Sequence, residues 1–119
     1  MKTLSRFLEE AKEAKEVLNK ISSAYERKHP GMKLSLQHND RTNTIRVNKI
    51  EVPKEKQGKG IGSRAMRGIA SYAQKQNLPV TLTPEPEKGK KAALNRFYNR
   101  HGFKKNKDLA ISDTLIKNP

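Results

Sequence analysis

The chain has 119 residues, no cysteine and a formal net charge of +14, from 26 Lys and Arg against 12 Asp and Glu. This length suits a single domain, and the lack of cysteine excludes disulfide bonds, thiol catalysis and thiolate metal sites. No apolar run is long enough to span a membrane and no secretory signal opens the chain, so we expect a cytoplasmic protein without a membrane partner. The charge favours phosphate-bearing partners, and its even spread fits a solvated basic surface as well as a nucleic-acid face.

Residues 3–28 contain neither glycine nor proline and are predicted to form one long helix, which His29-Pro30-Gly31 ends. Apolar residues recur along it at steps of three and four, a heptad seam made by Leu4, Phe7, Ala11, Ala14, Leu18, Ile21 and Tyr25. The alanines at its centre bury little area, so the seam is a weak coiled coil on its own. We expect residues 1–30 to be a packing or oligomerisation element, lying against the domain of residues 31–119 or against a neighbouring subunit.

Two strands are predicted next, over 32–38 and 43–52, with a hairpin turn at residues 39–42. The apolar alternation of the second strand changes phase between Val47 and Ile50. A phase change of this kind indicates a bulge or bend near Asn48-Lys49.

An amphipathic helix is predicted over 61–76 and a short buried strand over 78–82. The loop after this strand is marked by Pro84 and Pro86. A further helix over 88–101 ends at Gly102 and turns inward Ala93, Leu94, Phe97 and Tyr98. Two weak strands around 103–105 and 112–117 complete a mixed α/β fold.

Between the second strand and the helix over 61–76, the segment KEKQGKGIGSRAM (54–66) places Gly58, Gly60 and Gly62 among lysines. The first amides of a helix lack partners in the chain and lie at the positive end of its dipole, and glycine lets an anion approach the backbone. The spacing fits neither the P-loop nor the dinucleotide fingerprint, because Gly60 follows Lys59 and Ser63 stands where the fingerprint needs glycine. We therefore predict a phosphate cradle of another kind.

The pattern Gln57-x-x-Gly60-x-Gly62 resembles the acetyl-coenzyme A (acetyl-CoA) loop of the GNAT N-acetyltransferase superfamily. A second segment, Phe97-Tyr98-Asn99-Arg100-His101-Gly102-Phe103, resembles the F-Y-x-x-x-G-F segment of the same family. The resemblance covers residues 43–119. It implies an α/β GNAT-like fold with a mostly antiparallel sheet splayed at a coenzyme cleft. It also implies acetyl-CoA as cofactor and transfer of an acetyl group to a primary amine.

The resemblance also implies roles for single residues. The pyrophosphate of the coenzyme would lie on the backbone amides of Gly58, Lys59, Gly60, Ile61, Gly62 and Ser63. The strand edge at Ile50 and Val52 would pair with the pantetheine arm. Further coenzyme contacts are implied for Gln57 and Asn95. Tyr98 matches the general acid of the family, and the amide of Val52 matches the donor to the developing oxyanion.

Two features depart from the family pattern. The family often has a glutamate that acts as general base, more than ten residues before the glycine loop. In this chain the corresponding region, residues 39–44, contains no glutamate. Asp40 falls in the predicted turn and Glu51 lies too near the loop, so no general base is assigned. One long helix replaces the strand and two short helices that usually enclose the acceptor. We therefore expect an open acceptor site, suited to a protein amine. The histidines are too scattered for a metal site.

The first eleven residues, with the pattern M-K-T-x-x-x-F-x-x-E-A, look like short segments that carry internal proteins into the capsids of some large tailed phages. Residues 112–119 resemble the ends of phage-encoded GNAT domains. This likeness implies a phage protein in the host cytoplasm or the virion. The missing carboxylate and the long N-terminal helix motivate the alternative of a non-catalytic GNAT-fold binding or structural protein, such as a virion component, that assembles through this helix. Nucleic-acid binding is a third hypothesis, although three Phe, three Tyr and no Trp argue against a stacking platform.

Overall fold

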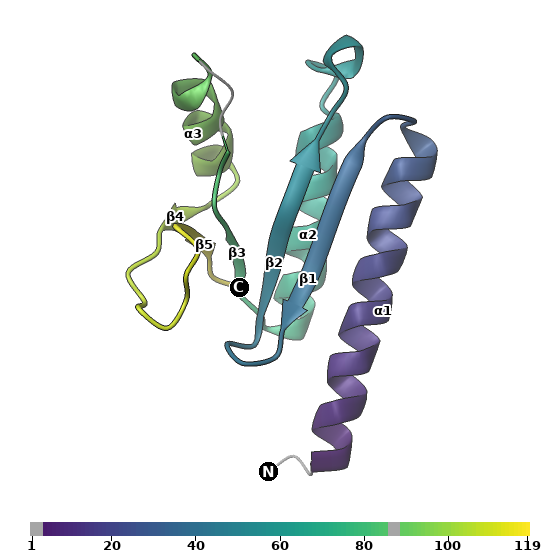
Figure 1. Cartoon of the computed structure of the whole chain (residues 1–119), viewed down its shortest axis with the longest axis vertical. Helices are drawn as coiled ribbons and strands as arrows, with labels where there is room; N and C mark the ends of the chain where they lie inside the picture. Colours follow the sequence, from purple (N-terminus) through teal and green to yellow (C-terminus); the bar gives the residue numbers. More distant parts are fainter. Residues whose placement is uncertain (1–3, 86–88) are drawn as a thin grey trace.

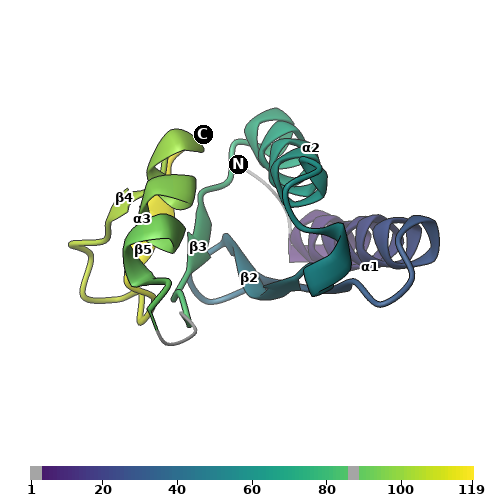
Figure 2. The same ribbon diagram turned by 90° about the horizontal axis from the view of Figure 1, so that it is seen from above.

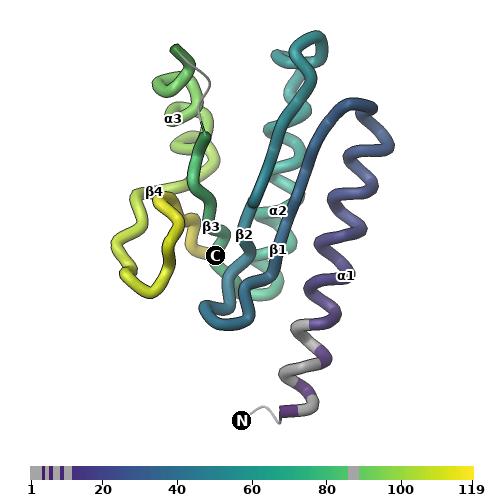
Figure 3. The backbone as a smooth tube through the Cα atoms, in the orientation of Figure 1, coloured from purple at the N-terminus to yellow at the C-terminus, as the bar shows by residue number. Residues whose placement is uncertain are grey.

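The computed structural model of the protein describes residues 4–85 and 89–119 (Figure 1). Within the first helix, the side chains at positions 5, 7, 8, 10 and 11 are also left out (Figure 3). Phe7 and Ala11 of the predicted seam, Pro86 of the predicted loop and residues 1–3 of the phage-like segment therefore lie outside the described residues.

The described chain forms helices and strands in the predicted order. These elements are α1 (Leu4–Lys28), β1 (Lys33–Asn39), β2 (Thr44–Glu51), a 3₁₀ turn (Lys54–Lys56), α2 (Ile61–Gln76), β3 (Val80–Leu82), α3 (Lys91–Arg100), β4 (Lys104–Lys105) and β5 (Leu115–Lys117). The mixed α/β class is confirmed. Within residues 4–85 and 89–119, no helix is both long and apolar enough to cross a membrane.

The sheet has the order β1-β2-β3-β5-β4 and is antiparallel except between β2 and β3. In the hairpin, Ser35 pairs with Lys49 and Leu36 pairs with Val47, so Asn48 is the extra residue on β2. This bulge lies where the change of apolar phase predicted it. It restores the pairing of Ile50 with Leu34, which keeps the apolar side of the strand on the core.

The parallel pair β2–β3 is short. Only Ile45 with Val80 and Arg46 with Thr81 are in register, next to a hydrogen bond of 2.9 Å from the Ile45 amide to the carbonyl of Pro79. Beyond these pairs the two strands diverge, and the sheet opens as a V in the direction of the glycine loop (Figure 1). The splayed sheet expected from the family resemblance is therefore present.

Helices α1 and α2 lie on the same side of the β1–β2 hairpin (Figure 2). The described part of the seam packs within the chain: Leu18 is 1 % exposed in the main core, and the Tyr25 hydroxyl donates to the carbonyl of Arg64 at 3.2 Å. At the helix start, Leu4 is 74 % exposed. On the opposite face of the hairpin, the alternate residues Lys33, Ser35 and Gln37 are exposed, so this face is open.

Helix α3 departs from the expectation at one residue. Leu94 and Phe97 are partly buried and Tyr98 is buried, as predicted, but Ala93 is exposed. Ala93 lines the cleft that α2 and α3 border, which accounts for its exposure.

Candidate active site

A cleft of ≈ 620 Å³ occupies the V between β2 and β3 and extends to α2 and α3. Most residues singled out in the sequence line it: Ile50, Val52, Gln57, Gly58, Gly60, Ile61, Gly62, Ser63 and Tyr98. Lys59 and Asn95 do not line the cleft, and both are exposed. The topology thus gathers the strand edge, the glycine loop and the aromatic helix around one space.

The glycine loop leaves the beginning of α2 uncapped. Gly60 is the residue before the helix, and no side chain of the described residues caps the helix there. The first helical bond runs from the Arg64 amide to the Gly60 carbonyl at 3.0 Å, so the amides of Ile61–Ser63 precede it and have no acceptor within the helix. Gly58 and Gly60 have φ of +81° and +78°, and a Cβ at either would meet nothing within 4 Å. Open donors with free space in front of them fit a phosphate group.

Hydrogen bonds tie this loop to the rest of the chain. The Gln57 side-chain amide donates to the carbonyl of Val52 at 3.0 Å, and Lys56 Nζ donates to the carbonyl of Pro30 at 2.7 Å. Gln57 therefore braces the loop against the end of β2. Lys59 and Arg64 are exposed beside it and add positive charge at the rim.

Tyr98 lies on the other wall of the cleft and is 5 % exposed. Its ring makes edge contacts with Phe97 and Phe103, at centroid distances of 5.2 Å and 5.6 Å. Burial raises the pKa of the Tyr98 phenol, because the charged phenolate is poorly solvated there. None of the described residues hydrogen-bonds to its hydroxyl, which is therefore a protonated donor available to a ligand.

Sequence reasoning missed a contact between the glycine loop with its helix and the aromatic segment of residues 97–103. His101 Nε2 lies 3.2 Å from the Ser63 hydroxyl, which joins the residue after α3 to the first turn of α2. The His101 ring also packs on Phe97 at a centroid distance of 4.8 Å. Nothing in the sequence indicated this contact, because His101 stood out only as one of three scattered histidines.

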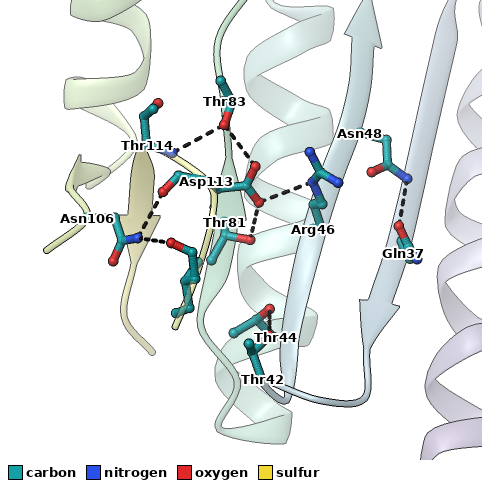
Figure 4. Close-up of polar contacts among 11 residues, drawn as sticks. Gln37, Thr42, Thr44, Arg46, Asn48, Thr81, Thr83, Asn106, Asp113 and Thr114 are labelled. Carbon is teal, nitrogen blue, oxygen red and sulfur yellow. Dashed lines mark hydrogen bonds and ion pairs between the residues drawn. The ribbon is translucent and has the colours of Figure 1, made fainter. Parts of the chain in front are cut away.

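A second missed feature is a buried polar cluster where β2 and β3 separate (Figure 4). Asp113 is 5 % exposed and accepts hydrogen bonds from the hydroxyls of Thr81 at 2.8 Å and Thr83 at 2.9 Å. Arg46 Nε lies 3.2 Å from the same carboxylate and forms an ion pair with it. The Nε–H bond does not point at the carboxylate, so this contact is not a hydrogen bond. The carboxylate of Asp113 is therefore a structural acceptor that ties the 106–114 loop to the strands.

Comparison with known proteins identifies the family. A sequence model of the acetyltransferase (GNAT) domain matches residues 24–105. The chain belongs to the GNAT acetyltransferase family. This match confirms the family and the coenzyme class, acetyl-CoA, that the two motifs predicted.

Two solved structures are similar to the chain, and the first of them shows a similar fold. The anti-CRISPR protein AcrVA5 is 21 % identical with a TM-score of 0.51, over 71 % of this chain and 85 % of its own. Arabidopsis thaliana Naa50, in complex with the bisubstrate analogue CoA-Ac-MVNAL, is 19 % identical with a TM-score of 0.45, over 71 % of this chain and 59 % of its own. No curated protein matches the chain.

Among the described residues, no carboxylate hydrogen-bonds to the Tyr98 hydroxyl. Asp40 lies in the hairpin turn, where its carboxylate is 3.0 Å from His38 Nδ1. Glu51 lines the cleft but is exposed and pairs with Lys49 at 3.5 Å. Glu85, which the sequence treatment did not name, is exposed at the cleft wall. In the part of the chain that is described, no three His, Asp or Glu side chains gather as metal ligands would.

Proposed function

We propose that the protein is an acetyl-CoA-dependent N-acetyltransferase that acts on a primary amine of a protein, with Tyr98 as general acid. One observation carries this proposal: the open amides of the glycine loop and the unpartnered Tyr98 hydroxyl border the same cleft, at the place where β2 and β3 separate.

The glycine loop would bind the pyrophosphate of the coenzyme. Backbone amides of residues 58–63 supply the hydrogen bonds, and the α2 dipole and the side chains of Lys59 and Arg64 add positive potential. The unpaired edge of β2 at Ile50–Val52 would pair with the amides of the pantetheine arm, as an added strand does. The hydrogen bond from the Gln57 side chain to the Val52 carbonyl holds the glycine loop in position against this strand edge.

Acetyl-CoA supplies an acetyl group activated as a thioester. Attack by the acceptor amine forms the new C–N bond and breaks the C–S bond. The amide of Val52 would stabilise negative charge on the carbonyl oxygen, and Tyr98 would give its proton to the departing sulfur. The amine must also lose a proton, for which we propose water in the cleft, because the carboxylates described near it are exposed or engaged.

A protein acceptor is supported by the open face of the β1–β2 hairpin, where Lys33, Ser35 and Gln37 are exposed. A small amine would be better served by an enclosed pocket. The alternative function is a non-catalytic GNAT-fold binding or structural protein. It is favoured by the lack of a carboxylate suited to act as general base among the described residues, since Asp40, Glu51 and Glu85 are exposed and the first two pair with other side chains.

Calorimetric titration with acetyl-CoA tests coenzyme binding, and mass spectrometry of a cell lysate incubated with the protein and isotope-labelled acetyl-CoA tests transfer. We expect binding and newly labelled amines. Absence of binding would contradict the whole proposal. Binding without any labelled product would favour the non-catalytic alternative.

A further inference from the structure

Ser63 and His101 connect the two walls of the coenzyme cleft at its phosphate end. Ser63 is the third residue of α2 and lines the cleft, and its hydroxyl oxygen is 3.2 Å from Nε2 of His101. Behind this contact, the His101 ring rests on Phe97. An imidazole therefore lies directly behind a hydroxyl that faces the proposed pyrophosphate site.

The charged groups around His101 come from each element packed against it. Arg67 extends from α2, Arg100 ends α3 and Lys117 ends β5. Burial, and then these three cations, lower the pKa of His101, so its ring is neutral at neutral pH in the free protein. A proton on this ring would add a fourth positive charge to the group.

The protonation state of His101 decides how the Ser63 hydroxyl can be used. A neutral imidazole can either donate a hydrogen bond to Ser63 through Nε2 or accept one there from the Ser63 hydroxyl. In the second arrangement the hydroxyl hydrogen points to the ring and cannot be donated to a ligand. A protonated imidazole can only donate, which leaves the Ser63 proton free for an anion in the cleft.

We propose that His101 is a positioning residue for the coenzyme, and that it takes up a proton when a diphosphate group binds at the glycine loop and Ser63. This inference rests on the proposed function, because it requires the diphosphate at residues 58–63. The two negative charges of the ligand offset the cations around the ring and favour imidazolium. The imidazolium in turn fixes the Ser63 hydroxyl as a donor to the ligand.

The sign of the pH effect follows from this linkage. At a pH above the pKa that His101 has in the complex, no proton is taken up on binding. At a pH between this value and the lower pKa of His101 in the free protein, uptake approaches one proton for each ligand bound. Affinity for the diphosphate therefore rises as pH falls through this window. It levels off below the pKa of the free protein, where both states are protonated.

The experiment is isothermal titration with dephospho-coenzyme A in buffers of different ionisation enthalpy, which reports the protons taken up on binding. This probe lacks the 3′-phosphate, whose own second ionisation near pH 6 would otherwise contribute. For the native chain we expect net uptake near neutral pH. His101→Gln retains an amide that can donate to Ser63 but cannot titrate, so it should bind without uptake and with an affinity independent of pH.

His38→Gln is the matched control. His38 lies on β1 beside the hairpin turn, at the end of the hairpin away from the glycine loop, and its ring contacts Asp40 and Asn43 at 3.0 Å each. This variant should keep the proton uptake of the native chain. Uptake that survives in His101→Gln, or that disappears in His38→Gln alone, would overturn the inference.

Native binding without proton uptake would also overturn it, while leaving the proposed function intact. Absence of binding would remove both. An NMR titration of the native histidine ring protons covers the case in which His101→Gln does not fold. The pKa of His101 must then rise when dephospho-coenzyme A is added, and an unchanged value would end the inference.

Discussion

The hydroxyl of Thr81 donates to the carboxylate of Asp113 over 2.8 Å, although the two residues are 32 positions apart in the chain. Thr81 belongs to the last pair of the parallel β2–β3 ladder, so this bond lies at the apex of the cleft. The 106–114 loop is thereby anchored at the point where the sheet opens.

Asp113→Asn should destabilise the protein. The substitution removes the negative charge beside Arg46 and presents an amide to two hydroxyls in a buried place, which costs about 1–3 kcal/mol. Urea unfolding followed by circular dichroism measures the change. Glu16→Gln, at an exposed position of α1, serves as the control and should be neutral. Equal stability of the two variants would show that the cluster contributes little.

Tyr98→Phe should lower the rate of acetyl transfer by about 10²-fold or more and leave the dissociation constant of acetyl-CoA unchanged. The hydroxyl has no described partner in the protein, so stability should change little. Because burial raises the pKa of Tyr98, the native rate should show no loss from its ionisation up to about pH 10. Steady-state rates and calorimetry test both statements, and an unchanged rate would remove Tyr98 from the mechanism.

Gly62→Val should block the coenzyme without harming the fold. A Cβ at Gly62 would lie 3.6 Å from the Phe97 ring, an ordinary contact, and the backbone there does not need glycine. The added methyl groups would occupy the cleft between α2 and α3, and we expect affinity to fall by more than about tenfold, or about 1.4 kcal/mol. Ser71→Val places the same side chain on an exposed part of α2 and should bind normally.

Gly31→Ala should destabilise the protein more than Gly58→Ala does. Both glycines have positive φ, so alanine is strained by about 1 kcal/mol at either position. At Gly31 the new Cβ would also come within 2.9 Å of the Pro53 ring, whereas at Gly58 it would meet nothing within 4 Å. The difference in unfolding free energy between the two variants measures the contact of the α1–β1 turn with Pro53.

The free protein should lose stability as the pH falls from about 7 through the lowered pKa of His101. The unfolded chain titrates this histidine near pH 6.5, and folding lowers its pKa, so in this window the unfolded state binds more protons and stability rises with pH. Thermal melts across this range should show a smaller pH dependence for His101→Gln. A larger dependence in the variant would contradict the direction of the shift.

Sequence patterns within single segments predicted those parts of the fold that depend on interactions between residues close in the chain. The bulge at Asn48 follows from the apolar phase of one strand, and α2 follows from a glycine loop and an amphipathic period within twenty residues. The Asp113 cluster and the Ser63–His101 contact each join segments more than thirty residues apart. Nothing in the spacing of a single segment marks such pairs, because the packing of separate elements creates them. The exposure of Ala93 escaped prediction for the same reason.

The short parallel ladder of β2 and β3 has a consequence for the whole molecule. Because β2 and β3 share two residue pairs, few backbone hydrogen bonds join the two halves of the sheet. A ligand whose amides pair with the β2 edge would add hydrogen bonds in the gap between these halves. Binding of such a ligand would raise the free energy of unfolding, so the ligand-free protein would be less stable than the complex.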